Sequence, residues 1–243
     1  MGKINIVAHI FLMLSLLSCA PKEEPVTREQ ALSKGYAMLD RKQYDEAIHY
    51  FANLAEQDSH FRVKLAWASA YAARAGIKIE TIYAFVTAKN PQKSETLQLY
   101  GLTFDKQAKA LFENLQSYEA VWNKIPAIST PAREDLQQAV AILSDSANPG
   151  VRLYSAALRA VILKSIISEG LRNWNLTQQK NCVSEIKPFW DWSLQVVENL
   201  IQLAQDLEGA YPSKLEFVDA RIKLQQLLTQ AHAQPPPSGE ACF

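Results

Sequence analysis

The 243-residue chain contains few of the residues that shape β-hairpins or bind metals: 8 glycines, 3 cysteines and 4 histidines. No pair of alternating apolar–polar segments bounded by turn residues occurs, so we do not expect a β-rich fold. The histidines lack the i, i+4 spacing of a helical metal site. Zinc-protease, nucleophile-elbow and phosphate-binding glycine motifs are also missing. We therefore predict that the protein is not an enzyme and has no catalytic residues and no metal.

An excess of charge of one sign is also lacking, since 25 basic residues balance 25 acidic ones. Nucleic-acid binding needs a clustered excess of Lys and Arg, so we do not expect nucleic acid as a partner. The longest N-terminal apolar run, residues 4–17, is shorter than the roughly 20 residues that a transmembrane helix needs. The sequence thus indicates neither a polybasic membrane patch nor a confident spanning helix.

Residues 1–18 are predicted to be a secretory signal, because the apolar run follows a charged start at Lys3. The four residues that end at Cys19, LLSC, resemble the bacterial lipobox. This resemblance implies that Cys19 receives diacylglycerol on its sulfur and becomes the new N-terminus, with a further acyl chain such as palmitate on its amine. The alternative is an ordinary signal peptide that is cut near Ala20. We expect no cofactor other than this covalent lipid.

The predicted lipid would also set the location of the protein, because several acyl chains anchor a protein durably. In lipoproteins of this type, an Asp after the lipidated cysteine commonly retains the protein at the inner membrane. Ala20 occupies that position here. The resemblance therefore favours an anchor in the outer membrane, facing the periplasm, with the inner membrane as the alternative.

Two further cysteines, Cys182 and Cys242, lie far apart in the sequence. In an oxidising envelope such a pair favours a disulfide bond. Two unpaired thiols are the alternative, and neither cysteine has a histidine nearby in the sequence that would suggest zinc.

Helical repeats are predicted after a short tether at residues 19–28. Gly35, Tyr44, Ala47 and Phe51 follow one another at spacings of nine, three and four. This spacing is typical of a tetratricopeptide (TPR) repeat, a helix–turn–helix unit of about 34 residues. Gly35 would let two antiparallel helices approach closely, Ala47 is small where they cross, and Tyr44 and Phe51 would fill the seam. Thr27 and Gln30 should form a capping box at the start of the first helix.

The predicted fold is all-α, with TPR-like hairpins in residues 29–92 that form a right-handed superhelix. A degenerate second repeat covers residues 60–88. Residues 93–232 are expected to form further helical hairpins or a bundle, and residues 233–243 a proline-rich tail. Residues 104–125 carry an apolar stripe, and residues 151–167 are apolar nearly all round, as in a central helix. Residues 170–181 are expected to be a polar connection. The last helix should bury a stripe: Leu215, Val218, Ile222, Leu227 and Leu228.

Stacks of helical pairs commonly bind partners in a concave groove that the first helix of each pair lines. We expect six residues to line such a groove: Lys34, Met38, Arg41, Lys64, Trp67 and Tyr71. The aromatic pair Trp67 and Tyr71 lies one turn apart and could form a binding hot spot. The alternative is that both rings fill the core between helices.

Together, the lipobox and the repeat resemble bacterial lipoproteins that carry TPR-like repeats. The resemblance implies an envelope scaffold that binds another envelope protein or peptide. A different possibility is a small-ligand-binding accessory lipoprotein of a solute transporter, of the TRAP-associated type. Its small-molecule ligand would lie near residues 151–167 or beneath residues 170–181. A purely structural envelope lipoprotein is the third possibility.

The lipobox generates a direct prediction. Replacement of Cys19 by alanine removes the acceptor sulfur, so the variant should accumulate as an unlipidated precursor that leaves the outer-membrane fraction. Membrane fractionation with metabolic labelling by a fatty acid measures both effects. Outer-membrane recovery of Cys19→Ala at the wild-type level would contradict the predicted anchor.

Overall fold

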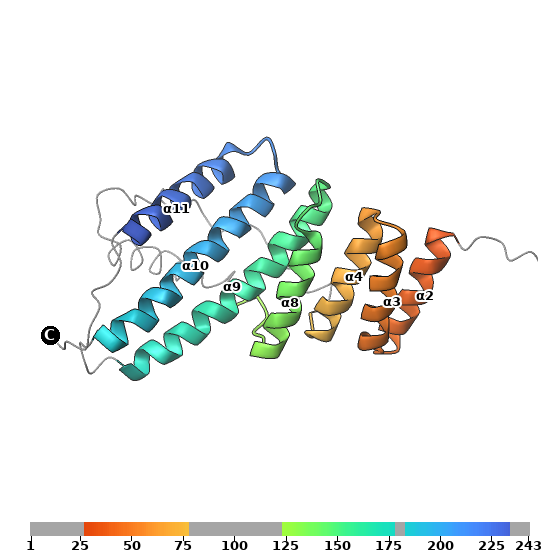
Figure 1. Cartoon of the computed structure of the whole chain (residues 1–243), viewed down its shortest axis with the longest axis horizontal. Coiled ribbons are helices and arrows are strands. Elements are labelled where there is room, and N and C mark those ends of the chain that lie inside the picture. Colours follow the sequence, from red (N-terminus) through yellow and green to blue (C-terminus); the bar gives the residue numbers. More distant parts are fainter. Residues whose placement is uncertain (1–26, 78–122, 178–182, 234–243) are drawn as a thin grey trace, which may run out of the picture.

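The computed structural model describes residues 27–77, 123–177 and 183–233. These residues form seven helices and no strand, which confirms the all-α prediction (Figure 1). The predicted signal, Cys19, Cys182, Cys242, the stripe at residues 104–122, the second half of the degenerate repeat and the tail lie outside the described residues. The helices are α2 (Arg28–Asp40), α3 (Tyr44–Gln57), α4 (Phe61–Arg74), α8 (Thr130–Leu143), α9 (Pro149–Thr177), α10 (Val183–Ala210) and α11 (Leu215–Ala233).

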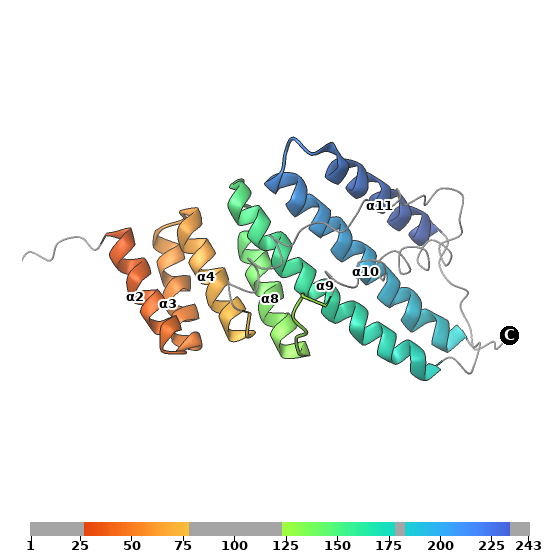
Figure 2. The ribbon, with the colours of Figure 1, turned by 180° about the vertical axis from the view of Figure 1, so that it is seen from behind.

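The helices form an elongated array in which α2 and α11 lie at opposite ends (Figures 1 and 2). Each described helix makes its most extensive contacts with its neighbours in the array, and α4 and α8 are direct neighbours. Helices α2, α3, α4 and α8 stand side by side, while α9, α10 and α11 are inclined to them. The described helices therefore follow one another in a row.

The first helix begins where the sequence predicts it. The hydroxyl of Thr27 accepts a hydrogen bond from the backbone N–H of Gln30, at 3.3 Å. The side-chain oxygen of Gln30 accepts one from the backbone N–H of Thr27, at 2.8 Å. This reciprocal pair is the predicted capping box, and it satisfies two backbone donors at the start of α2.

α2 and α3 approach each other closely at Gly35. A Cβ atom at this position would collide with the ring of Phe51, which is fully buried and lies between the rings of Tyr36 and Tyr50. Ala47 is also fully buried in the same core. The absence of a side chain at Gly35 thus makes room for the Phe51 ring.

α4 carries small residues that are buried on two opposite sides of the helix. Ala66 and Ala70 belong to the smaller core, which α4 shares with α2 and α3. Ala68 and Ala72 belong to the larger core, which extends through α8 and α9 to α10. The larger core therefore joins residues on both sides of the domain boundary that we predicted at residue 92.

Arg74, in the last turn of α4, links three helices through its guanidinium group. It donates to Asp45 of α3 at 2.5 Å and to both carboxylate oxygens of Asp135 of α8, at 2.5 and 3.0 Å. These hydrogen bonds raise the pKa of Arg74 above its usual value, so the group stays charged. The link fixes the end of α4 between its two neighbours.

α9 is longer than predicted. Its apolar part, residues 151–167, is buried as expected, but the helix continues to Thr177. The expectation of a polar connection from residue 170 is therefore wrong for residues 170–177. Packing against α10 is the physical reason: glycine disfavours a helix interior, but the missing Cβ of Gly170 leaves room for the Trp192 ring. The indole N–H of Trp192 also donates to the carbonyl of Ile166, at 2.9 Å.

A buried ionic cluster joins α9 and α10. Asp206 of α10 is buried and accepts hydrogen bonds from Arg152 at 2.9 Å, from Ser155 at 2.6 Å and from Arg159 at 2.6 Å. These three donors lie on one side of α9. A buried carboxylate is stable only with such partners, so the cluster fixes the register of the two long helices.

The last helix buries a different side from the one we predicted. Leu224, Leu227 and Ala231 are buried, and Leu228 is partly buried. Leu215 and Ile222 are 70% and 42% exposed, so the prediction that they are buried is wrong. α11 packs against α10, whose Val197 and Ile201 share a core with Leu224 and Leu227.

The contact at Gly35 generates a stability prediction. Gly35→Val should lower the free energy of unfolding by about 2 kcal/mol, because the added atoms overlap a ring that has no free space around it. Chemical denaturation of the purified protein measures the change. Ser33→Val, at an exposed position of the same helix, is the control and should change stability by less than about 0.5 kcal/mol.

The smaller side chain in Phe51→Leu should relieve the overlap, so the double variant should be less destabilised than the sum of the single variants. Strict additivity would contradict the proposed collision.

Candidate functional site

The six predicted groove residues lie in different environments in the structure. Lys34 extends over the ring of Tyr50, with its amino group 5.3 Å from the ring centre. Met38 packs against the smaller core. Arg41 is exposed and follows the end of α2. Lys64 lines a pocket near the start of α4.

The two predicted groove aromatics are partly buried and pack against the cores. Trp67 is partly buried against the smaller core, and its buried indole N–H has no hydrogen-bond partner among the described residues. Tyr71 packs against both cores, and the Arg74 guanidinium lies 5.3 Å from the centre of its ring. The core-filling alternative describes these two positions better than a shared binding surface does.

Helix geometry separates the predicted groove residues of α4 from two other residues of that helix, Arg62 and Ser69. A residue in an α-helix is rotated by about 100° from the one before it. Lys64, Trp67 and Tyr71 therefore share one side of α4, whereas Arg62 and Ser69 lie on the opposite side. This opposite side of α4 faces α2 and α9, as the contacts below establish.

We define the α2–α4–α9 face by five residues: Glu29, Tyr36, Arg62, Ser69 and Tyr154. Arg62 of α4 forms an ion pair with Glu29 of α2 at 3.0 Å, with side chains that are 51% and 65% exposed. Tyr36 of α2 is 43% exposed. Partial burial raises its pKa above the ordinary value, and the nearby Arg62 makes this rise smaller. The face thus presents an aromatic ring and a positioned guanidinium to solvent.

Tyr154 connects this face to α9. Burial raises the pKa of its phenol, and Ser69 of α4 and Tyr36 of α2 lie close enough to shift that pKa as well. Ser69 occupies the position that corresponds to Gly35 after a shift of one 34-residue repeat. Sequence reasoning missed Tyr36 and Arg62, because the groove was predicted from other polar and aromatic positions of the same two helices.

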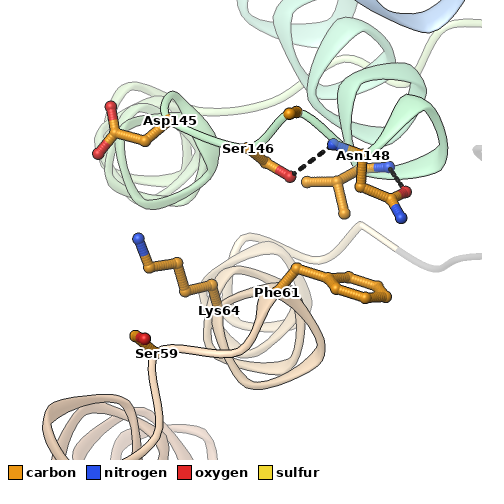
Figure 3. A pocket seen from close by; sticks show the side chains of 8 residues that line it. Ser59, Phe61, Lys64, Asp145, Ser146 and Asn148 are labelled. Atoms are coloured by element: carbon orange, nitrogen blue, oxygen red, sulfur yellow. Dashed lines mark hydrogen bonds between the residues drawn. The ribbon is translucent and has the colours of Figure 1, made fainter.

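A pocket with a volume of about 290 Å³ lies at the other side of α4, near its start. Ser59, Phe61 and Lys64 line it from α4 and the residues before it (Figure 3). The connection between α8 and α9 contributes Asp145, Ser146, Ala147 and Asn148, and Val151 of α9 completes the lining. We refer to it as the Lys64 pocket.

No group of three or more His, Cys, Asp or Glu side chains that could hold a metal ion occurs in residues 27–77, 123–177 or 183–233. Within the same part of the chain, no helix combines the length and apolar character that crossing a bilayer requires.

Tyr154 allows a pH test of the link between α4 and α9. A phenol whose pKa is raised in the folded state stabilises the fold below the ordinary tyrosine pKa of 10.0. This contribution is lost as the pH rises through the raised value. The free energy of unfolding should therefore fall more steeply above pH 10.0 in the wild type than in Tyr154→Phe.

At neutral pH the same substitution should cost less than about 1 kcal/mol, because it removes only the polar contact of the hydroxyl with Ser69. Denaturant unfolding at a series of pH values measures both effects. Tyr211→Phe, at an exposed position, is the control. Parallel alkaline profiles for the wild type and Tyr154→Phe would contradict the role of Tyr154.

Comparison of the chain with protein-family models, with curated proteins and with solved structures finds no match.

Proposed function

We propose that the protein is a lipid-anchored helical adaptor of the bacterial cell envelope. It binds a segment of another envelope protein on the α2–α4–α9 face. The lipid on Cys19 holds the chain in the outer membrane, and the helical array extends into the periplasm. In this proposal α2 and α4 are the first helices of two successive TPR-like pairs.

The exposed pair of Tyr36 and Arg62 carries the proposal. Tyrosine and arginine are enriched among the residues that contribute most to protein–protein binding. Tyr36 is 43% exposed, and the ion pair with Glu29 orients the guanidinium of Arg62 beside it. An oriented side chain loses less conformational entropy when a partner binds.

The shape of the array also supports an adaptor. Helical arrays whose members contact mainly their neighbours present extended surfaces to partners. The contacts of α2 with α4 and of α4 with α9 make one surface that three helices share. A peptide segment that lies across these helices would contact Tyr36 and Arg62 together.

The experiment uses the full-length lipidated protein, purified from detergent-solubilised envelopes with its bound proteins. The test variant is Tyr36→Ala/Arg62→Ala. Tyr211→Ala/Lys214→Ala is the matched control, because it removes an exposed tyrosine and a basic residue at the other end of the array. Quantitative mass spectrometry compares the proteins that co-purify with each form.

We expect one envelope protein to co-purify with the wild type and with the control, and to fall by about tenfold or more with the test variant. Circular dichroism should give the same helix content for all three forms. Equal recovery of every protein with all three forms would reject the α2–α4–α9 face as the binding surface. If the wild type recovers no protein at all, the adaptor function itself is rejected.

A further inference from the structure

The Lys64 pocket contains two opposite charges that are not paired with each other. No carboxylate lies within ion-pair distance (4.0 Å) of the Lys64 amino group among the described residues, and no cation lies within that distance of Asp145. The carboxylate of Asp145 accepts only a hydrogen bond from the neighbouring Ser144, at 3.3 Å. Both charged groups are therefore available to a molecule that enters the pocket.

Two further polar groups in the lining have unused donors. The hydroxyl oxygen of Ser146 accepts from the backbone N–H of Asn148 at 3.2 Å, which leaves the hydroxyl hydrogen free to donate. The side-chain oxygen of Asn148 caps the start of α9, where it accepts from Gly150 and Val151 at 3.0 and 3.2 Å. Its NH₂ group remains free to donate. These donors favour a ligand with an acceptor such as a carboxylate.

The pocket has a charged end and an apolar end. Figure 3 shows Lys64 and Asp145 at one end and Phe61 at the other. Phe61 is 38% exposed, although it is a large apolar ring. Val151, which also lines the pocket, is buried. A ligand with both charges at one end and an apolar group at the other would match this lining.

The volume of the pocket limits the size of the ligand. At about 290 Å³ it lies at the lower end of the range of small-molecule sites. A molecule smaller than a typical drug is therefore expected, and one that carries an ammonium and a carboxylate on the same carbon atom satisfies both unpaired charges.

We propose that the Lys64 pocket binds a free α-amino acid with an apolar side chain. The ligand carboxylate pairs with Lys64 and accepts from Ser146 or Asn148. The ligand ammonium pairs with Asp145, and the apolar side chain contacts Phe61 and Val151. This site is separate from the α2–α4–α9 face, because Arg62 and Lys64 point to different sides of α4.

The test measures the binding of L-leucine to the full-length lipidated protein in detergent micelles, by isothermal titration calorimetry and by ligand-observed NMR. Leucinamide lacks the carboxylate, and N-acetyl-leucine lacks the ammonium, so each analogue isolates one charge. We expect saturable binding of leucine and binding that is about tenfold weaker or more for each analogue.

Two variants test the assigned partners. Lys64→Met and Asp145→Asn should each weaken leucine binding by about tenfold or more. Lys124→Met and Asp219→Asn make the same changes at exposed positions elsewhere and should bind like the wild type. Thermal melting shows whether each variant is folded.

Three results would overturn the proposal. The first is no binding of leucine at millimolar concentration, as expected if Lys64 and Asp145 pair with each other in solution. The second is equal binding of leucine and its two analogues. The third is unchanged leucine binding by both pocket variants. None of these results bears on the α2–α4–α9 face, so the two proposals fail independently.

Discussion

Close contact on two opposite sides of α4 holds the array together. Ala66 and Ala70 bring α4 against α2 and α3, while Ala68 and Ala72 bring it against α8 and α9. All four side chains are almost completely buried, so no larger residue fits at these positions without moving a neighbouring helix. Because both sides are occupied, the two remaining sides of α4 decide what the helix presents to solvent.

Those two remaining sides carry the two binding surfaces that we propose. Arg62 and Lys64 are two residues apart, which places them about 200° apart around the helix. Arg62 contributes to the α2–α4–α9 face, and Lys64 contributes to the pocket under the connection between α8 and α9. In these two proposals, a protein segment and a small molecule would have separate sites on one helix, and neither would have to displace the other.

The ionic contacts of the array differ in how much they contribute to the stability of the fold. The ion pairs of Arg62 with Glu29 and of Arg74 with Asp45 are partly exposed, and such pairs contribute at most about 1 kcal/mol each. They orient side chains more than they stabilise the fold. Asp206 is different because it is buried, and the loss of its arginine partners would leave an uncompensated charge inside the protein.

The sequence alone determined the features that depend on residues close together in the chain. The all-α class follows from composition and periodicity, and the capping box at Thr27 needs only residues three apart. The buried character of residues 151–167 could be predicted because that segment is apolar nearly all round. Such features depend on interactions between residues that are close in the sequence, so they can be predicted without knowledge of the tertiary contacts.

Tertiary structure decided which side of each helix meets a neighbour. α11 has apolar residues on more than one side, and only the position of α10 selects Leu224 and Leu227 for burial and leaves Leu215 exposed. The helical continuation of α9 past Gly170 depends on Trp192 of another helix, and the cluster at Asp206 joins residues about 50 positions apart. The candidate site shows the same limit, since Tyr36 and Arg62 become neighbours only when α2 packs against α4. Periodicity identifies an apolar side of a helix, but the neighbouring helices determine which side is covered.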